Sequence, residues 1–182
     1  MPLATTGAHR PLASARTGAR IATTGKTRDT GVMSETRRLH RNDDSVITRL
    51  LHTSATWAVV GLSANTARTA YGVARFLQDT LGHRVIPVHP RAEFTLGEAG
   101  YASLGDIPDG TRVDVVDCFV NSDRVGEVVD EAIDQADRLG ISAVWLQLGV
   151  IDEGAAQRAK DAGLSVVMDT CPKIEYSTPN GF

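Results

Sequence analysis

The chain has 182 residues, of which 42% are hydrophobic and 23% are charged, and its formal net charge is −3. This length allows one globular domain with an additional segment, and no stretch approaches the roughly 18 consecutive apolar residues of a membrane-spanning helix. Residues 43–182 hold eleven Lys and Arg against twenty Asp and Glu. This acidic part of the chain is unsuited to general nucleic-acid binding, which needs a positively charged surface.

Residues 1–42 form a basic leader, with eight Lys and Arg against two Asp and Glu and few large apolar side chains. Such a segment cannot bury enough apolar surface to offset its chain entropy, so we predict that it is disordered. A solvated leader is the preferred interpretation. A transit peptide and a nucleic-acid-binding arm are the alternatives, the former because residues 1–28 are rich in Arg and carry no acidic residue.

From residue 43 onward, helical and strand-like patterns alternate. Asp43 supplies an N-cap for a first helix. Apolar residues at helical spacing predict further helices, each followed by a glycine, at about 69–81, 122–139 and 152–162. Near-continuous apolar runs predict five strands, at 57–61, 84–88, 113–120, 143–148 and 164–168. We expect residues 91–110 to be irregular and His83 to lie at the surface.

Apolar strands of this kind are typical of a parallel sheet covered on both faces, and the helices between them provide right-handed crossovers. The sequence therefore predicts an α/β domain over residues 43–182, with a doubly wound sheet of five parallel strands in the order 2-1-3-4-5. Ligands of such sheets bind beyond the carboxyl ends of the strands, at the switch point between the first and third strands.

The loop after the first strand has the features of a phosphate site. Gly61 ends the strand, and Ser63 and Asn65 lead into the next helix, whose first backbone N–H groups lack intrahelical partners. A dinucleotide fingerprint would contain G-x-G-x-x-G, whereas this loop has a single glycine. The pattern favours a phosphate-bearing ligand over NAD or a flavin.

The second strand ends in Val88-His89-Pro90-Arg91, with no carboxylate before Glu93. Enzymes that use NAD carry an acidic residue at this strand tip to hold the ribose hydroxyls. A cationic tip suits a phosphorylated ribose instead, which NADP carries at the 2′ position and coenzyme A at the 3′ position. Together with the single glycine, Arg91 favours coenzyme A.

Five runs of sequence between residues 56 and 175 carry a family resemblance: VVGLS, YGVARFLQ, IPVHPR, VWLQLGV and VMDTCPK. In these runs the chain resembles the small free-standing CoA-binding proteins, which are similar to the nucleotide-binding domain of the succinyl-CoA synthetase alpha subunit. The resemblance implies a Rossmann-like domain that binds coenzyme A or an acyl-CoA.

The resemblance also assigns roles to residues at the strand ends. The pyrophosphate would be held by Gly61, Leu62, Ser63 and Arg68, the adenosine would be bordered by Pro90 and Arg91 and flanked by Phe119 and Asn121, and the pantetheine arm would face Gln147, Leu148 and Gly149. The chain has His89 where relatives usually have Asn, and it lacks the Arg that often follows the strand-three Phe. One cationic contact of the family is therefore expected to be missing.

Two cysteines, Cys118 and Cys171, lie far apart in the sequence and belong to no C-x-x-C or Cys/His cluster. A disulfide framework and a metal site are therefore not expected, and reduced thiols favour a cytoplasmic location. Cys171 follows the fifth strand beside Lys173, which would lower the pKa of its thiol. It is either an inert half-buried cysteine or a thiol that forms a mixed disulfide with the pantetheine thiol.

No nucleophile–base or acid–base pair is evident, so we expect a protein that binds coenzyme A without catalysis and is not an enzyme. An NADP- or NAD-dependent oxidoreductase is an alternative, although it would need a second glycine in the first loop and a substrate domain. A component like the alpha subunit of CoA ligases is another, although it would need a phosphorylatable histidine and a partner chain. The expected partner is a small molecule rather than nucleic acid or membrane, and a homodimer is compatible with the sequence.

Overall fold

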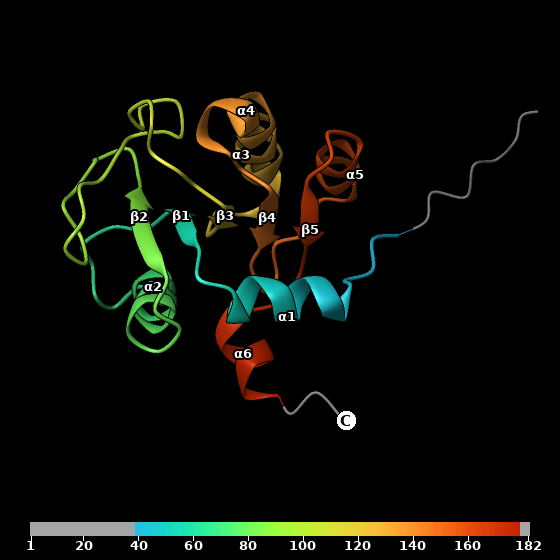
Figure 1. Ribbon diagram of the computed structural model, residues 1–182, viewed down its shortest axis with the longest axis horizontal. Helices are drawn as coiled ribbons and strands as arrows, with labels where there is room; N and C mark the ends of the chain where they lie inside the picture. The colour runs from blue at the N-terminus through green and yellow to red at the C-terminus, as the bar shows by residue number, and fades with distance from the viewer. Residues whose placement is uncertain (1–38, 179–182) are drawn as a thin grey trace, which may run out of the picture. The chain divides into compact units, whose positions relative to one another are not determined.

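Residues 39–178 are described by a computed structural model. Five parallel strands form one sheet in the order β2-β1-β3-β4-β5 (Figure 1). The strands are β1 (Thr56–Val60), β2 (Arg84–Val88), β3 (Val115–Cys118), β4 (Ala143–Leu146) and β5 (Ser165–Val167). The predicted fold class, the parallel direction and the strand order are confirmed. The predicted leader falls outside these residues except for 39–42.

Helices cover both faces of the sheet, as the continuous apolar strands predicted (Figure 1). On one face lie α1 (Asp44–His52), α2 (Thr69–Asp79) and α6 (Pro172–Ser177). On the other lie α3 (Ser122–Asp134), α4 (Ala136–Leu139) and α5 (Glu153–Asp161). No helix among the described residues is long and apolar enough to cross a membrane.

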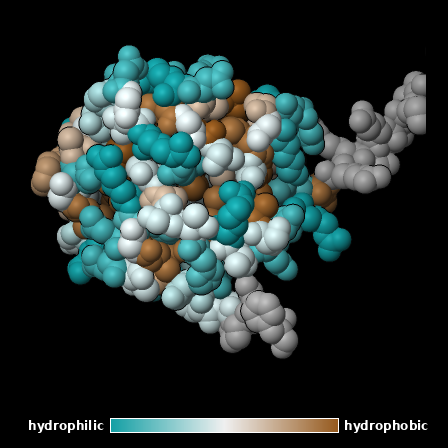
Figure 2. Space-filling model, in the orientation of Figure 1, coloured by the Kyte–Doolittle hydropathy of each residue, from teal (hydrophilic) through white to brown (hydrophobic). Residues whose placement is uncertain are grey.

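Each face of the sheet has its own apolar core. Trp57 and Val59 of β1 point to the side of α1 and α2, whereas Ala58 between them points to the side of α3. All three side chains are fully buried. On the face seen in Figure 2, hydrophobic residues are interspersed among hydrophilic ones, as expected where the large apolar side chains are mostly inside.

The structure differs from the sequence prediction mainly at element ends. The third strand is assigned only over Val115–Cys118, although the N–H groups of Asp114 and Phe119 on either side still donate to Thr56 and Val60 of β1. The helix predicted over 122–139 is divided at Gln135 into α3 and α4, and the short α6 was not predicted. Its Pro172 occupies the first turn, where a missing N–H costs nothing.

The prediction that His83 lies at the surface is wrong. Its side chain is 3% exposed and stacks on Trp57, with 5.5 Å between the ring centroids. Its Nδ1 accepts a hydrogen bond from the backbone N–H of Ala55 at 3.2 Å. Burial lowers the pKa of His83, since a charged imidazole would lose its hydration there.

Four residues of the predicted leader, 39–42, are described, and two of them bond to the domain. The side-chain amide of Asn42 pairs with both backbone groups of Met168, at 2.8 Å each, just beyond β5. The backbone N–H of His40 donates to Glu153 at 2.7 Å. These contacts attach the segment before α1 to the residue that follows β5 and to the first residue of α5.

Candidate functional site

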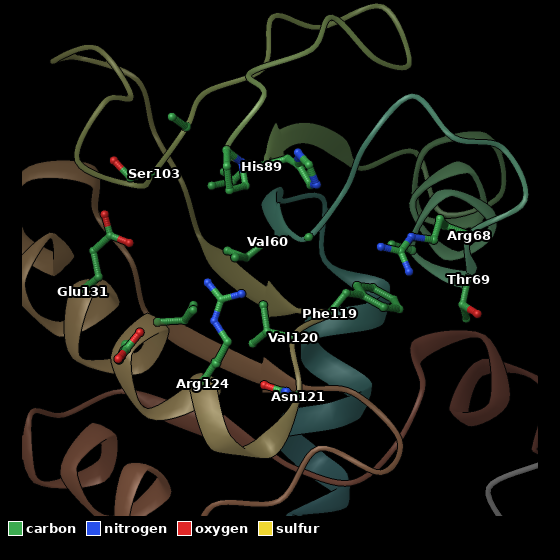
Figure 3. A pocket seen from close by; sticks show the side chains of 17 residues that line it. Val60, Arg68, Thr69, His89, Ser103, Phe119, Val120, Asn121, Arg124 and Glu131 are labelled. Carbon is green, nitrogen blue, oxygen red and sulfur yellow. The ribbon is translucent and has the colours of Figure 1, made fainter.

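A cleft of about 670 Å³ opens where β1, β2 and β3 end, at the switch point of the sheet (Figure 3). Its volume lies in the range of small-molecule sites. We call this space the cleft. It is lined by Val60, Gly61, Arg68, Thr69, Ala70, Val88, His89, Pro90, Ala102, Ser103, Phe119, Val120, Asn121, Arg124, Glu127, Val128 and Glu131.

Gly61 joins the ends of the three strands at the base of the cleft. Its N–H donates to the carbonyl of Val88 at 2.7 Å, and its φ of +98° is in the region that favours glycine. A Cβ at this position would lie 2.5 Å from the backbone oxygen of Phe119, closer than van der Waals contact allows. Only glycine lets the backbone of β1 pass this close to that of β3.

The loop after Gly61 delivers the N-terminus of α2 to the cleft. Ser63 is 2% exposed, and the side chain of Asn65 accepts the N–H of Ala67 at 3.0 Å in a local turn. Arg68 is the N-cap residue and provides no side-chain cap to the helix. The first amides of α2, at Thr69 and Ala70, therefore stand at the positive end of the helix dipole and line the cleft.

Two guanidinium groups face the cleft. In Figure 3 the side chains of Arg68 and Arg124 point toward its centre from opposite sides. Neither forms an ion pair with any residue in the range 39–178. Two unpaired cations beside a helix N-terminus favour an anion with several oxygen atoms, such as a phosphate or pyrophosphate.

The wall formed by α3 has acceptors and apolar groups. Glu127 and Glu131 line this wall, and Oε1 of Glu131 accepts the N–H of Gly105 at 2.9 Å. Val120 and Val128 provide apolar surface between them and the strand ends. The cleft therefore combines two cations on opposite sides, apolar surface and hydrogen-bond acceptors. No group of three or more metal-ligating side chains occurs among the residues placed by the structure.

Residues 55–177 match the family described as the CoA binding domain. The chain belongs to this family. This CoA-binding protein is 34% identical to the Bacillus subtilis protein YneT over 131 residues. The aligned region covers 72% of this chain and 92% of YneT.

Solved structures agree with the assignment. A Pyrococcus horikoshii protein is 33% identical with a TM-score of 0.66, over 75% of this chain and 94% of the other. The acetyl-coenzyme A synthetase 1 of Ca. Korarchaeum cryptofilum, solved with phosphate and ADP, is 26% identical with a TM-score of 0.56. The match covers 68% of this chain and 27% of that longer chain.

Six of the residues predicted for the ligand line the cleft of the CoA-binding domain: Gly61, Arg68, His89, Pro90, Phe119 and Asn121. Leu62 and Ser63 are buried and lie outside the lining, and the side chain of Asn65 accepts the N–H of Ala67 within the same loop. Arg91 is exposed outside the lining, where its Nε lies 3.5 Å from Oε1 of Glu93. The role predicted for Arg91 stays a prediction.

Arg124 is the functional candidate that the sequence interpretation missed. The expected Arg after Phe119 is absent, but Arg124 reaches the same cleft from the first turn of α3. A first-turn residue of a helix that follows a central strand stands at the carboxyl edge of the sheet. That position is the signal by which Arg124 could have been found.

The residues predicted for the pantetheine arm lie outside the cleft lining. Gln147 is 4% exposed, and its Nε2 donates to Oδ1 of Asp117 at 2.6 Å. Leu148 is 62% exposed beside it, and the N–H of Gly149 donates to Asp169 at 2.7 Å. These contacts hold the loop after β4, and its approach to a ligand stays a prediction.

Asp117 is a second residue that the sequence interpretation missed, since it is a lone carboxylate inside an apolar run. Its side chain is fully buried in β3, and Oδ2 has no hydrogen-bond partner. Burial raises the pKa of Asp117 to about 7, against the opposing effect of the hydrogen bond from Gln147. This carboxyl group therefore titrates near neutral pH.

Cys171 and Lys173 lie at the start of α6, away from the cleft. The Cys171 side chain is 9% exposed and packs in the apolar cluster that contains Trp145 and Val167. Its thiol and that of Cys118 are both free. Lys173 is exposed. A mixed disulfide between Cys171 and a ligand thiol would require Cys171 to become accessible, and it stays a prediction.

Proposed function

We propose that this protein binds coenzyme A in the cleft and performs no catalysis of its own. The observation that carries the proposal is the arrangement of Gly61, the α2 N-terminus and the two unpaired guanidinium groups around one cleft, in a member of the CoA-binding family. Two free cysteines, Cys118 and Cys171, fit the reducing cytoplasm, where we place the protein.

The charges of the cleft suggest how the ligand lies. The pyrophosphate would accept hydrogen bonds from the first amides of α2 and from Arg68, with Arg124 as a second cation. The nucleoside would lie against Val120 and Val128, with the carboxylate of Glu127 as an acceptor for its donors. The pantetheine arm would leave past Asn121 toward the loop after β4.

The proposal of binding without catalysis rests on the hydrogen bonds of the polar side chains in the cleft. Ser103 donates its hydroxyl proton to the carboxylate of Asp106, three residues further along the same exposed loop, at 2.7 Å, and no third group among the described residues orients that carboxylate as a catalytic base requires. The ring of His89 accepts the N–H of Arg91 through Nδ1 at 3.2 Å and faces no serine or cysteine nucleophile among the cleft residues. A catalytic nucleophile–base pair would need a nucleophile hydrogen-bonded to a base that a third group holds in position.

Isothermal titration with coenzyme A, acetyl-CoA, dephospho-CoA and NADP⁺ tests the proposal. We expect coenzyme A to bind and NADP⁺ to bind much more weakly. Weaker binding of dephospho-CoA would show that the protein contacts the 3′-phosphate. Tighter binding of acetyl-CoA than of coenzyme A would show that the protein recognises the acyl group. Binding of NADP⁺ without binding of coenzyme A would refute the proposal.

Arg124→Ala is expected to weaken coenzyme A binding roughly tenfold, because one charge-assisted hydrogen bond to phosphate contributes about 1.5 kcal/mol. The measurement is the dissociation constant from the same titration. The matched control is Arg75→Ala, since Arg75 lies on α2, pairs with Asp79 and does not line the cleft. Equal affinities for the wild type and the Arg124 variant would show that this side chain does not contact the ligand.

A further inference from the structure

The carboxylate of Glu93 contacts two donors of the kind that bind phosphate, in the loops after β1 and β2. Its Oε2 accepts the backbone N–H of Ala64, in the loop after β1, at 3.0 Å. Its Oε1 lies 3.5 Å from Nε of Arg91, the cation that the sequence assigns to a ribose phosphate. One internal anion therefore bridges the ends of β1 and β2.

The turn after β2 holds Glu93 in this position. The N–H of Ala92 donates to the carbonyl of His89 at 2.7 Å, and Ala92 has a φ of +47°, a conformation that residues with a side chain rarely adopt. Gly100 packs against the same backbone so closely that a Cβ there would lie 2.3 Å from the carbonyl oxygen of Glu93. Strained backbone of this kind often marks a ligand-binding segment.

A carboxylate that accepts a loop N–H and pairs with an arginine makes the contacts that a phosphate oxygen would make. We propose that Glu93 is an internal competitor of the nucleotide phosphates, so that coenzyme A binds only after the carboxylate leaves Ala64 and Arg91. This inference rests on the proposed function. By linkage, removing the competitor must raise the affinity for the ligand.

The opposite role, a brace that preorganises the loop for binding, makes the opposite prediction. If Glu93 were a brace, its removal would let the loop around Ala64 move, and affinity would fall. Glu93→Gln separates the two roles further, because an amide oxygen can still accept the N–H of Ala64 while the negative charge is gone. A competitor predicts tighter binding for both the Gln and the Ala variants.

The experiment is titration of wild type, Glu93→Ala and Glu93→Gln with coenzyme A, and with pantetheine as a probe that lacks phosphate. We expect coenzyme A to bind about three- to tenfold more tightly to both variants. Each variant removes the exposed ion pair between Glu93 and Arg91 and the negative charge that would repel a phosphate. Pantetheine should show no such gain. Glu98→Gln is the matched control, because Glu98 lies in the same segment but pairs with Arg84; its affinity should equal that of the wild type.

Unchanged or weaker binding of coenzyme A to both Glu93 variants, with wild-type binding intact, would overturn the inference and leave the proposed function standing. Failure of the wild type to bind coenzyme A would instead refute the proposed function. Thermal denaturation of each variant checks folding. Should Glu93→Ala unfold, Glu93→Gln alone decides the question, since it keeps the acceptor for Ala64.

Discussion

Gly61→Ala is expected to lower the free energy of unfolding by roughly 2 to 5 kcal/mol and to abolish coenzyme A binding. Two effects add at this position. The φ of +98° is unfavourable for any residue with a Cβ, and that Cβ would lie 2.5 Å from the backbone oxygen of Phe119. Relief would require β1 and β3 to separate at their ends, where the cleft is formed.

Two other glycines provide matched controls for this prediction. Gly82 has a φ of +70° with nothing within 4 Å of the added Cβ, so Gly82→Ala isolates the conformational effect, at about 1 kcal/mol. Gly72 lies in α2 with open space and no positive φ, so Gly72→Ala should be neutral or slightly stabilising. Urea denaturation gives the three values. An effect for Gly61→Ala no larger than that for Gly82→Ala would contradict the close approach of the strands.

Asp117→Asn is expected to remove a large pH dependence of stability. In the folded protein the pKa of Asp117 is raised from 3.8 to about 7, whereas in the unfolded chain it is near 3.8. Between these values the folded state keeps a proton that the unfolded state releases. The stability due to the neutral carboxyl group is therefore fully present below pH 3.8 and is lost as the pH rises to about 7.

The expected loss for the wild type between pH 5 and pH 8 is on the order of 3 kcal/mol from this group. Denaturant unfolding at both pH values measures it, and the difference between wild type and Asp117→Asn isolates it. This comparison is needed because burial lowers the pKa values of His40 and His83, whose titration acts with the opposite sign below pH 6.5.

Asp79→Asn is the control for the Asp117 experiment, since Asp79 is an exposed carboxylate on α2. It should leave the pH dependence of the wild type unchanged. Asn at position 117 keeps an oxygen that can accept the hydrogen bond from Gln147, so the packing around β3 is preserved. Parallel pH curves for wild type and Asp117→Asn would show that Asp117 is ionised in the folded protein over this range.

Much of the architecture follows from local patterns in the sequence. Near-continuous apolar runs, with predicted helices in three of the four connections between them, predicted the parallel sheet and its order, and both are confirmed. Gly61, which the sequence places at the end of the first strand in a phosphate-binding loop, lines the cleft. These features are predictable because periodicity and turn chemistry depend on neighbours along the chain.

Local sequence patterns were therefore sufficient to predict the fold, the edge of the sheet that forms the cleft and the family resemblance. Three features appear only in the folded structure: Arg124 stands opposite Arg68, Gln147 donates to Asp117, and Glu93 accepts the N–H of Ala64. The burial of His83 against Trp57 is likewise visible only in the folded structure. Each of these features depends on how groups that are distant in the sequence come together on packing, which no local pattern specifies.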